Sequence, residues 1–509
     1  MPTLVEADGV LVNPFRMAGY DGAENNRKRK RTARNKSRAQ DEDRLIGRYD
    51  RETLRLECLN LRRNNAVVAG VCERFADNVV GPEGIRPQAR TSDESWNTQA
   101  ENFWAEWCKV ADSRGMFSFR EIQRLTVQSR LHSGEIGFIF LDNGQLQAIE
   151  ADRVASPEKA KENIIEGVEV GDAGRPQAYW ICNRDKNGYV DVKTAERINA
   201  RDFVHIFRPL RFDQLRGVPD LSPIINTLSD QGDLVESVLL KARLNARRSA
   251  IITTERGSST IGAIGPRNGN SQGSDSGQVY ETFGEDTLTY YLRNGEDAKL
   301  LSDDTPGQNY VEHNLFLLKM IGAAVSIPYQ FLMLDFSVGG AGNNRAALLQ
   351  TYRTFDTWQA WLKDKMLQRV WNWRIAKAIK NRELPPAPID ARGFSEWYKV
   401  DWTPPSYDWM DPQKEAAADK EYYNMGRRTL TSLVRQDGKD VRDVLTEKAS
   451  EIAIAVEQAQ KITAATGIQI SWRDLINTTL PGQNAAQAQV QNDSQDVPIS
   501  TPNGLDRWT

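Results

Sequence analysis

Apolar residues in the first quarter of the chain follow a helical period. Between residues 51 and 80 they recur every three, four or seven positions, which predicts an amphipathic helix that Gly81, Pro82 and Gly84 end. Its apolar positions are Leu54, Cys58, Leu61, Val68, Cys72, Phe75 and Val79. A second helix carries Trp104 and Trp107, and a third is expected from about 118 to 132.

The pattern then changes to short apolar runs that predict strands. Asn143-Gly144 lies between two runs within residues 134–150 and is a strong hairpin signal, because both residue types tolerate positive φ. A second strand pair is expected at 168–170 and 178–182, joined by a turn rich in glycine. Residues 203–207 form a further apolar strand. These elements predict an N-terminal α+β domain.

Long helical patterns dominate the rest of the chain. Pro219, Ser222 and Pro223 introduce a helix to about 246, and another is expected over 309–326, ending before Ile327-Pro328. The longest helix is expected to run from Asn343, its cap, to about 380. Its stripe of bulky apolar residues indicates packing in the core in preference to binding of a cofactor. That stripe comprises Leu348, Tyr352, Phe355, Trp358, Leu362, Met366, Val370 and Trp373. A smaller helical region follows Pro404-Pro405.

Length and charge limit the fold organisation and the classes of protein that the sequence allows. A chain of 509 residues is too long to fold around one compact core, so several packed units are expected. The net charge of −3 argues against a surface that grips phosphate everywhere. No apolar run is long enough for a membrane span, and the N-terminus lacks a signal-peptide core. Residues 1–45 read as an irregular arm with a basic run at 27–38, residues 257–278 as a flexible loop, and the tail from 481 as disordered.

Catalytic and metal-binding motifs are missing from the sequence. There is no phosphate-binding loop, zinc-protease motif or dinucleotide fingerprint, and four cysteines and three histidines are scattered, so no catalytic residue, metal or cofactor is assigned. Asp303-Asp304 reads as a surface turn. His205 and Glu135 read as packed or hydrogen-bonded residues in preference to a general base, since no nucleophile accompanies them. Cys58 and Cys72 read as buried, inert thiols.

Six short stretches, in order along residues 55–450, resemble the lambda family of phage portal proteins. The resemblance does not extend to the first 45 residues, the loop at 257–278 or the tail. The stretches are Leu61-Arg62-Arg63-Asn64-Asn65 with Asp77-Asn78-Val79-Val80-Gly81; Ser133-Gly134-Glu135 with Asp152-Arg153; Gly174-Arg175-Pro176; His205 with Arg216-Gly217-Val218-Pro219; Ile327-Pro328-Tyr329 with Asn344-Arg345-Ala346-Ala347; and Asp411-Pro412-Gln413-Lys414-Glu415.

The resemblance implies a ring subunit, usually one of twelve, through which DNA enters and leaves the capsid. After the arm at 1–45 it implies a wing at 46–218, a first stem helix at 219–248, a clip at 249–308 and a second stem helix with its connection at 309–334. A tunnel loop at 335–343, a spine helix returning to the wing at 344–400 and a helical crown at 401–475 follow, and the tail occupies 476–509. The implied partners are double-stranded DNA, the large terminase subunit, the major capsid protein and a head-tail adaptor protein. The implied location is the virion, after synthesis in the bacterial cytoplasm.

Two segments are expected to meet DNA in the channel. The glycine-rich tunnel loop comprises Ser337, Val338, Gly339, Gly340, Ala341 and Gly342. The basic group at the end of the first stem helix comprises Lys241, Arg243, Arg247 and Arg248; its alternative role is to complement the helix dipole or form salt bridges. A DNA-processing enzyme, such as a nuclease or packaging ATPase, and a capsid shell or scaffold protein are the competing classes.

Overall fold

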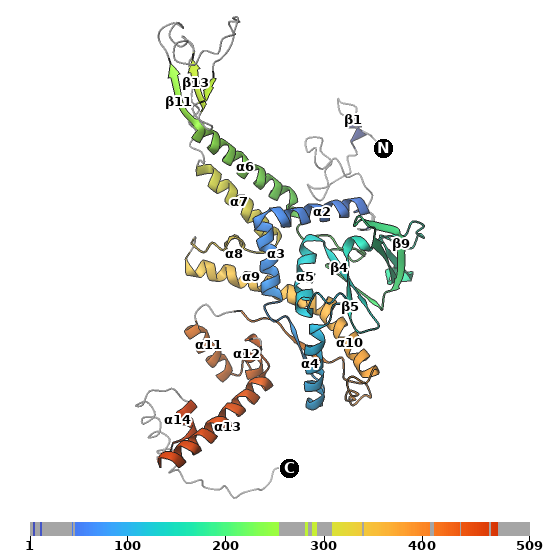
Figure 1. Ribbon diagram of the computed structural model, residues 1–509, viewed down its shortest axis with the longest axis vertical. Helices are drawn as coiled ribbons and strands as arrows, with labels where there is room; N and C mark the ends of the chain where they lie inside the picture. Colours follow the sequence, from blue (N-terminus) through green and yellow to red (C-terminus); the bar gives the residue numbers. More distant parts are fainter. Residues whose placement is uncertain are drawn as a thin grey trace. The chain divides into compact units, whose positions relative to one another are not determined.

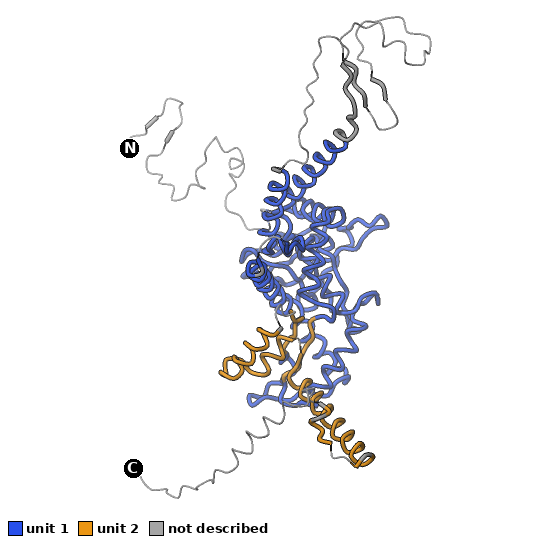
Figure 2. Tube along the Cα trace, turned by 90° about the vertical axis from the view of Figure 1, so that its left-hand side faces the viewer, with its two compact units in different colours: residues 1–84, 91–400 blue, residues 85–90, 401–509 orange. Residues whose placement is uncertain are grey.

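The computed structural model describes residues 46–253, 280–282, 288–292, 308–337, 340–407, 412–437, 439–467 and 470–476, with Asp43 and the short strands β1 (Leu4–Val5) and β2 (Leu11–Val12). It forms two compact units, residues 1–84 with 91–400 and residues 85–90 with 401–509 (Figure 2). Helices and small, mainly antiparallel sheets are combined, as predicted for an α+β protein. The basic run, the 257–278 loop, Asp303-Asp304 and the tail lie outside the described residues.

The predicted helix over 51–80 is two helices, α2 (Arg48–Asn64) and α3 (Ala66–Val79). Asn65 separates them in an extended conformation, and its side chain accepts hydrogen bonds from the backbone nitrogens of Val67 and Val68 at 3.0 and 3.2 Å. The apolar stripe continues across residue 65, but the capping hydrogen bonds of Asn65 end one helix there and begin another. The next two helices occur as predicted, α4 (Glu94–Lys109) and α5 (Phe119–His132), the latter capped by Ser118.

Two antiparallel sheets pack beside these helices. In the first, β4 (Glu135–Phe140) lies between β5 (Leu146–Glu150) and β10 (Phe203–Phe207). The β4–β5 pairing confirms the hairpin at Asn143-Gly144. The second sheet has the order β6 (Ile164–Ile165), β7 (Val168–Val170), β8 (Pro176–Arg184) and β9 (Val190–Asn199), which confirms the second predicted strand pair.

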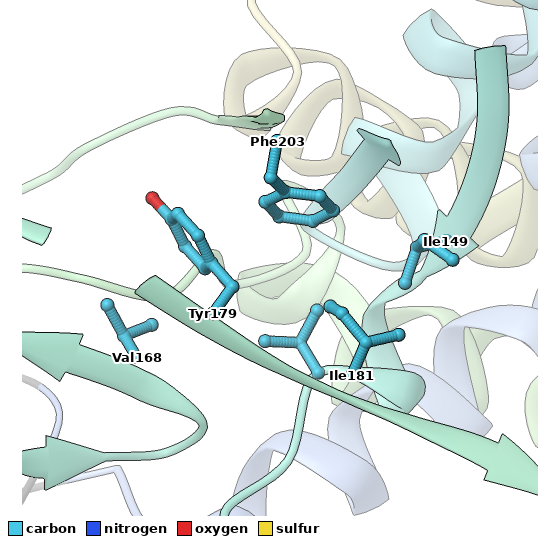
Figure 3. Close-up of a cluster of buried hydrophobic side chains, with 6 residues drawn as sticks. Ile149, Val168, Tyr179, Ile181 and Phe203 are labelled. Carbon is cyan, nitrogen blue, oxygen red and sulfur yellow. The ribbon is translucent and has the colours of Figure 1, made fainter. Parts of the chain in front are cut away.

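A buried cluster joins the two sheets. Tyr179 and Phe203 meet with their ring centroids 4.7 Å apart, and Ile149, Val168 and Ile181 gather around them (Figure 3). Because these residues come from β5, β7, β8 and β10, the cluster fixes the sheets against each other.

The longest predicted helix is a continuous rod that crosses the first unit (Figure 1). It consists of α9 (Ala341–Leu362), a π-helical turn at Lys363–Leu367 and α10 (Gln368–Lys380). The predicted stripe is buried at Phe355, Trp358, Leu362, Met366 and Val370. The π turn changes the phase of the stripe, since it also brings Leu367 and Trp371 into the core, which a plain helical period does not foresee.

The two other long helices lie side by side (Figure 1). A short 3-10 turn at Ser222–Ile224 leads into α6 (Ile225–Arg247), and α7 (Gln308–Ala324) returns along it, both close to their predicted limits. Between them in sequence come β11 (Arg248–Thr253), β12 (Tyr280–Thr282) and β13 (Leu288–Leu292), where β13 pairs in parallel with β11 and antiparallel with β12. The short helix α8 (Tyr329–Met333) follows Pro328.

The second unit combines a two-stranded sheet with four helices. The strand β3 (Arg86–Ala89) pairs with β14 (Val400–Thr403), and Arg90 bonds Asp401 and Asp440 at 3.2 Å each. The helices are α11 (Pro412–Asn424), α12 (Leu430–Gln436), α13 (Val441–Thr466) and α14 (Trp472–Ile476). In the described parts of both units, no helix has the length and apolar content that a membrane crossing requires.

The packing of α2 on α5 makes stability depend on pH. Arg62 of α2 bonds Nε2 of His132 at 3.1 Å, and since a guanidinium only donates, the imidazole is neutral, with its Nδ1 proton directed at Ser133. Burial and then the charge of Arg62 lower the pKa of His132 to about 3. An unfolded histidine takes up a proton below its ordinary pKa of 6.5, whereas the folded one does not.

We therefore predict that the free energy of unfolding falls as the pH drops from about 6.5 to about 5, by at most about 1.4 kcal/mol per pH unit from this residue. His132→Gln keeps an acceptor for Arg62 but does not titrate. In urea titrations its stability should change less over that interval than the wild type. Equal slopes for the two proteins would contradict the assignment.

Candidate functional site

The four basic residues predicted to face a channel occur at the end of α6. Lys241 and Arg243 are exposed. Being two residues apart, they point about 200° from each other around the helix, so they do not form one stripe. Arg247 is the last residue of α6 and Arg248 the first of β11, and their side chains lie outside the described residues. The two described side chains, those of Lys241 and Arg243, therefore lie on different faces of α6.

The predicted tunnel loop is shorter in the structure. Ala341 and Gly342 belong to the first turn of α9, and Gly340 is its N-cap, so the expected helix start at 344 and the expected capping role of Asn343 are wrong. The backbone nitrogens of Asn343 and Asn344 instead donate to the Gly340 carbonyl. Glycine is among the residue types that helix N-caps accept, which is consistent with Gly340 at this position. Val338 and Gly339 lie outside the described residues.

Both ends of this loop are anchored. Before it, Asp335 accepts hydrogen bonds from the Ser337 side chain and backbone, which lower the pKa of that carboxyl. After it, the Asn344 side chain donates to the Phe336 carbonyl at 3.0 Å. The chain between Ser337 and Gly340 is therefore held at its two ends by side-chain hydrogen bonds.

One charged side chain that the sequence predicts to be packed or hydrogen-bonded, that of Glu135, is almost completely buried. The carboxylate of Glu135, at the start of β4, accepts from Arg55 at 2.6 Å, from His205 at 3.0 Å and from the Gly217 backbone nitrogen at 2.6 Å. The Arg216 guanidinium binds both of its oxygens. We call Glu135, Arg55, Arg216 and His205 the Glu135 cluster. Its geometry confirms that Glu135 and His205 are packed, hydrogen-bonded residues.

Charge neutralisation makes this burial tolerable. Burial alone raises the pKa of Glu135, but the charges of Arg216 and Arg55, with His205, outweigh it and hold that pKa well below the usual range. Arg216 also donates to the carbonyls of Val154 and Ala151 at 2.7 and 2.8 Å. A buried ion pair is stable only when further hydrogen bonds satisfy its donors, as they do here.

Two glycines allow the chain segments of the cluster to meet. Gly134 has φ +83°, and a Cβ there would overlap the backbone of Val218 and Pro219. A Cβ on Gly217 would in turn overlap the Gly134 carbonyl. The motifs Ser133-Gly134-Glu135 and Arg216-Gly217-Val218-Pro219 are thus two halves of one contact. The glycines beside charged residues were the available signal, but a sequence does not say which segments pair.

The residues between the cluster and α6 are held equally firmly. Arg130 of α5 bonds Asp220 at 2.9 Å, and its guanidinium carbon lies 3.5 Å from the Trp358 ring centroid on α9. The backbone nitrogen of Leu221 donates to the Leu131 carbonyl at 3.2 Å. The segment just before α6 is therefore held against α5, and Arg130 also links it to Trp358 of α9.

The cysteines do not form a reactive or metal-binding site. Burial raises the pKa of Cys58 to about 12 and that of Cys72 to about 11, and both side chains are fully buried, as predicted. Within the described ranges, no group of three or more histidine, cysteine, aspartate or glutamate side chains is arranged to hold a metal ion.

Comparison with known proteins agrees with five of the six stretches, because the match to the family model ends before Asp411-Pro412-Gln413-Lys414-Glu415. A model of the family described as "Phage portal protein, lambda family" matches residues 27–359, which is well over half of the chain. The "Probable portal protein" of Halomonas phage phiHAP-1 is 23% identical over 445 residues, covering 82% of this chain and 83% of that protein.

Solved structures with partial similarity come from gene transfer agent (GTA) particles. The "Neck of native GTA particle computed with C12 symmetry" has a TM-score of 0.42 and 13% identity, covering 75% of this chain and 92% of that chain. The "Neck of empty GTA particle computed with C6 symmetry" has a TM-score of 0.42 and 15% identity, covering 74% and 90%.

The chain belongs to the lambda family of phage portal proteins. That membership gives it a portal role, and the family is a structural one.

We predict that Glu135→Gln lowers the free energy of unfolding by about 3 to 5 kcal/mol, because it leaves Arg216 and Arg55 buried without their counter-charge. Glu106→Gln, which removes an exposed partner of Lys109, should cost about 0.5 kcal/mol or less and is the matched control. Urea denaturation measures both.

The Glu135 cluster also predicts how the free energy of unfolding depends on pH. A carboxyl with a depressed folded pKa contributes stability that is complete above its ordinary pKa of 4.5 and is lost as the pH falls toward the folded value. Glu135→Gln should therefore flatten the decline in stability below about pH 4.5. A variant as stable as the wild type, with the same acid dependence, would show that the cluster contributes nothing.

Proposed function

We propose that this chain assembles into a closed ring, of twelve copies as is usual in the family, that serves as the conduit for DNA packaging and ejection at one capsid vertex. Membership of the portal family supports the conduit role. The observation that carries the ring is the surface of α6 and α7, which a single chain leaves uncovered.

Large apolar side chains are exposed along both helices. Leu239 and Leu240 on α6 and Val311, Phe316 and Met320 on α7 all lie at the surface. A helix that is apolar on several sides is normally covered by other protein. When one heterologous contact is repeated by rotation, it closes a ring. Neighbouring copies of the α6–α7 pair are the covering surface that such a ring provides.

The parts of the subunit take their roles from this arrangement. In it α6 and α7 form the stem, the β11–β13 sheet belongs to the clip, and α9 with α10 forms the spine. The helices α11 to α14 form the crown, and the α+β part of the first unit forms the wing. Residues 85–90 lie inside the range 46–218 expected for the wing. Because β3 pairs with β14, they instead belong to the second unit, which contains the proposed crown.

Contacts with DNA in this ring are weak and non-specific. The loop of Ser337, Val338, Gly339 and Gly340 carries no charge, so it fits sterically around the duplex. Some of Lys241, Arg243, Arg247 and Arg248 supply a diffuse positive potential, while the net charge of −3 per chain keeps overall affinity low. Such a channel lets a polyanion slide.

Other components supply what the ring lacks. The large terminase subunit hydrolyses ATP and docks on the ring, the major capsid protein surrounds it, and a head-tail adaptor protein attaches to it. The chain itself is no enzyme in this proposal; it is made in the bacterial cytoplasm and resides at the portal vertex of the virion.

We predict that the purified chain forms rings with a central hole about as wide as a DNA duplex and does not hydrolyse ATP. Negative-stain imaging and an ATPase assay with and without DNA test both parts. A stable monomer with metal-dependent nuclease activity would favour the DNA-processing enzyme, and closed shells would favour a capsid or scaffold protein.

A second prediction concerns the loop before α9. Deleting Val338 and Gly339 shortens the loop but keeps Ser337, the Gly340 cap and the Asn344 anchor, so rings should still form while DNA packaging into capsids declines strongly. Alanine at exposed Thr98 of α4, which lies outside the proposed α6–α7 contact, is a surface control that should leave both unchanged. Normal packaging by the deletion variant would remove this loop from the DNA path.

A further inference from the structure

Burial of the two helices α6 and α7, which lie side by side (Figure 1), ends partway along them. Close to the start of α6 and the end of α7, apolar side chains are almost completely buried, among them Leu228, Leu318 and Ile321. In residues 232–243 of α6 and 310–317 of α7, none of the described side chains is buried. The packed part of the pair therefore covers only the first turns of α6 and the last turns of α7.

A hydrogen-bonded polar pair lies where this packed part ends. Gln231 is 8% exposed, and its Nε2 donates to Oδ1 of Asn314 on α7 at 3.1 Å. A buried amide without a partner costs free energy, so the bond favours the one arrangement in which the two side chains meet. A polar pair within an apolar helix contact fixes the register of the helices in the same way. Gln231 and Asn314 thus hold α6 and α7 together at this level.

Glycine occupies the next position of α6, in the interior of the helix. The backbone of Gly232 is helical, and a Cβ at this position would meet no atom within 4 Å. Neither backbone conformation nor close packing within the subunit therefore requires glycine here. Glycine destabilises the interior of a helix relative to alanine, because its backbone loses more freedom when it becomes ordered. Gly232 is therefore a weak point of α6 that an alanine could fill without a steric conflict.

The chain is held differently on the two sides of Gly232. Before α6, Arg130 bonds Asp220 at 2.9 Å, and the backbone nitrogen of Leu221 donates to the Leu131 carbonyl at 3.2 Å. After Gly232, α6 continues to its last residue, and β11 begins at the very next residue. A change of direction at residue 232 would therefore carry β11 with it, while the start of α6 keeps its place on α5.

We propose that Gly232 is a hinge, about which the outer part of α6 (residues 233–247) and β11 change direction relative to the rest of the first unit. Hinges are a few residues that absorb changes of φ and ψ between two more rigid parts. The Gln231–Asn314 pair holds the helices together on the fixed side of this hinge. In the proposed ring, the hinge lets the clip turn while the wing keeps its position. The hinge itself belongs to the single subunit and does not depend on the ring.

Hydrogen exchange of the α6 amides, resolved to single residues by mass spectrometry, tests the hinge. The amides of residues 233–236 bond to carbonyls at 229–232, so their hydrogen bonds span Gly232. Opening at the hinge predicts that these four amides exchange about fivefold faster than those of residues 228–231, which is the effect of one interior glycine. They should also exchange faster than those of residues 237–240. Fraying from the outer end alone would instead give rates that rise steadily toward residue 240.

A glycine replacement and a matched control show whether residue 232 causes the effect. Gly232→Ala should remove the local maximum of exchange, because alanine favours the helix. Ser229→Ala replaces another exposed residue of α6 by alanine but keeps the glycine, so the maximum should remain. Uniform protection of the wild-type amides from 228 to 240 would overturn the hinge.

Distances between two spin labels measure the motion itself. In a Cys108→Ser background, which removes the one native cysteine that is not buried, Leu240→Cys beyond the hinge is paired with Glu57→Cys on α2. Labelled chains are diluted with unlabelled chain, so that only pairs within one subunit contribute. The distance distribution should be broad and should narrow in Gly232→Ala. The control pair, Asp230→Cys with Glu57→Cys, lies on the fixed side and should give a narrow distribution with either residue at 232.

The outcomes separate the hinge from a packing role of Gly232 and from the ring. A glycine that is needed for close approach by a neighbouring copy would show no local maximum of exchange, and Gly232→Ala would weaken the rings instead. An outer pair of labels as narrowly distributed as the control pair, or one that Gly232→Ala leaves unchanged, would overturn the hinge. A wild-type chain that forms no rings would contradict the ring, whereas the exchange and distance measurements would still decide the hinge.

Discussion

Neutralisation of one buried carboxylate, that of Glu135, is the constraint on which the first unit depends. Four groups from three distant segments converge on it: Arg55 from α2, His205 from β10, and Arg216 with the Gly217 amide from the segment before α6. None of these charged groups could be buried alone without a large penalty. The contact therefore forms as a whole, and it holds the helices, the sheet and the entry to α6 in one arrangement.

The position of the long helices follows from this constraint. From Arg216 the chain passes through Asp220, which Arg130 binds, and into α6 within a few residues. On the other side, Arg130 lies against Trp358 of α9, so the same arginine links the start of α6 to the rod of α9 and α10. In the proposed ring, each subunit needs its contact surfaces held at a fixed angle. The ion pairs and close glycine contacts described here link the segments that lead into α6 and α9.

Much of this fold could be predicted from the sequence, because hydrophobic period and turn chemistry are local signals. The hairpin at Asn143-Gly144, the limits of α6 and α7 and the extent of the long rod follow from them. Three features do not. Asn65 divides one apolar stripe into two helices, the π turn shifts another stripe toward Trp371, and Gly340 replaces Asn343 as a cap. The apolar pattern records neither the hydrogen bonds that Asn65 and the Gly340 carbonyl accept nor the change of helical phase at the π turn. The pairing of Glu135 with Arg216 was hidden for a different reason, since 81 residues separate them.

Hydrogen exchange of the backbone amides beside Glu135 tests most directly whether the cluster forms and opens as a whole. The Gly217 amide donates to Glu135, and the Leu215 amide to Asp43, which in turn binds Arg51. If the cluster is the constraint described, both amides should exchange as slowly as those at the centre of β4, with the same opening free energy. Exchange of the Leu215 and Gly217 amides at rates typical of surface loops, while β4 stays protected, would contradict it.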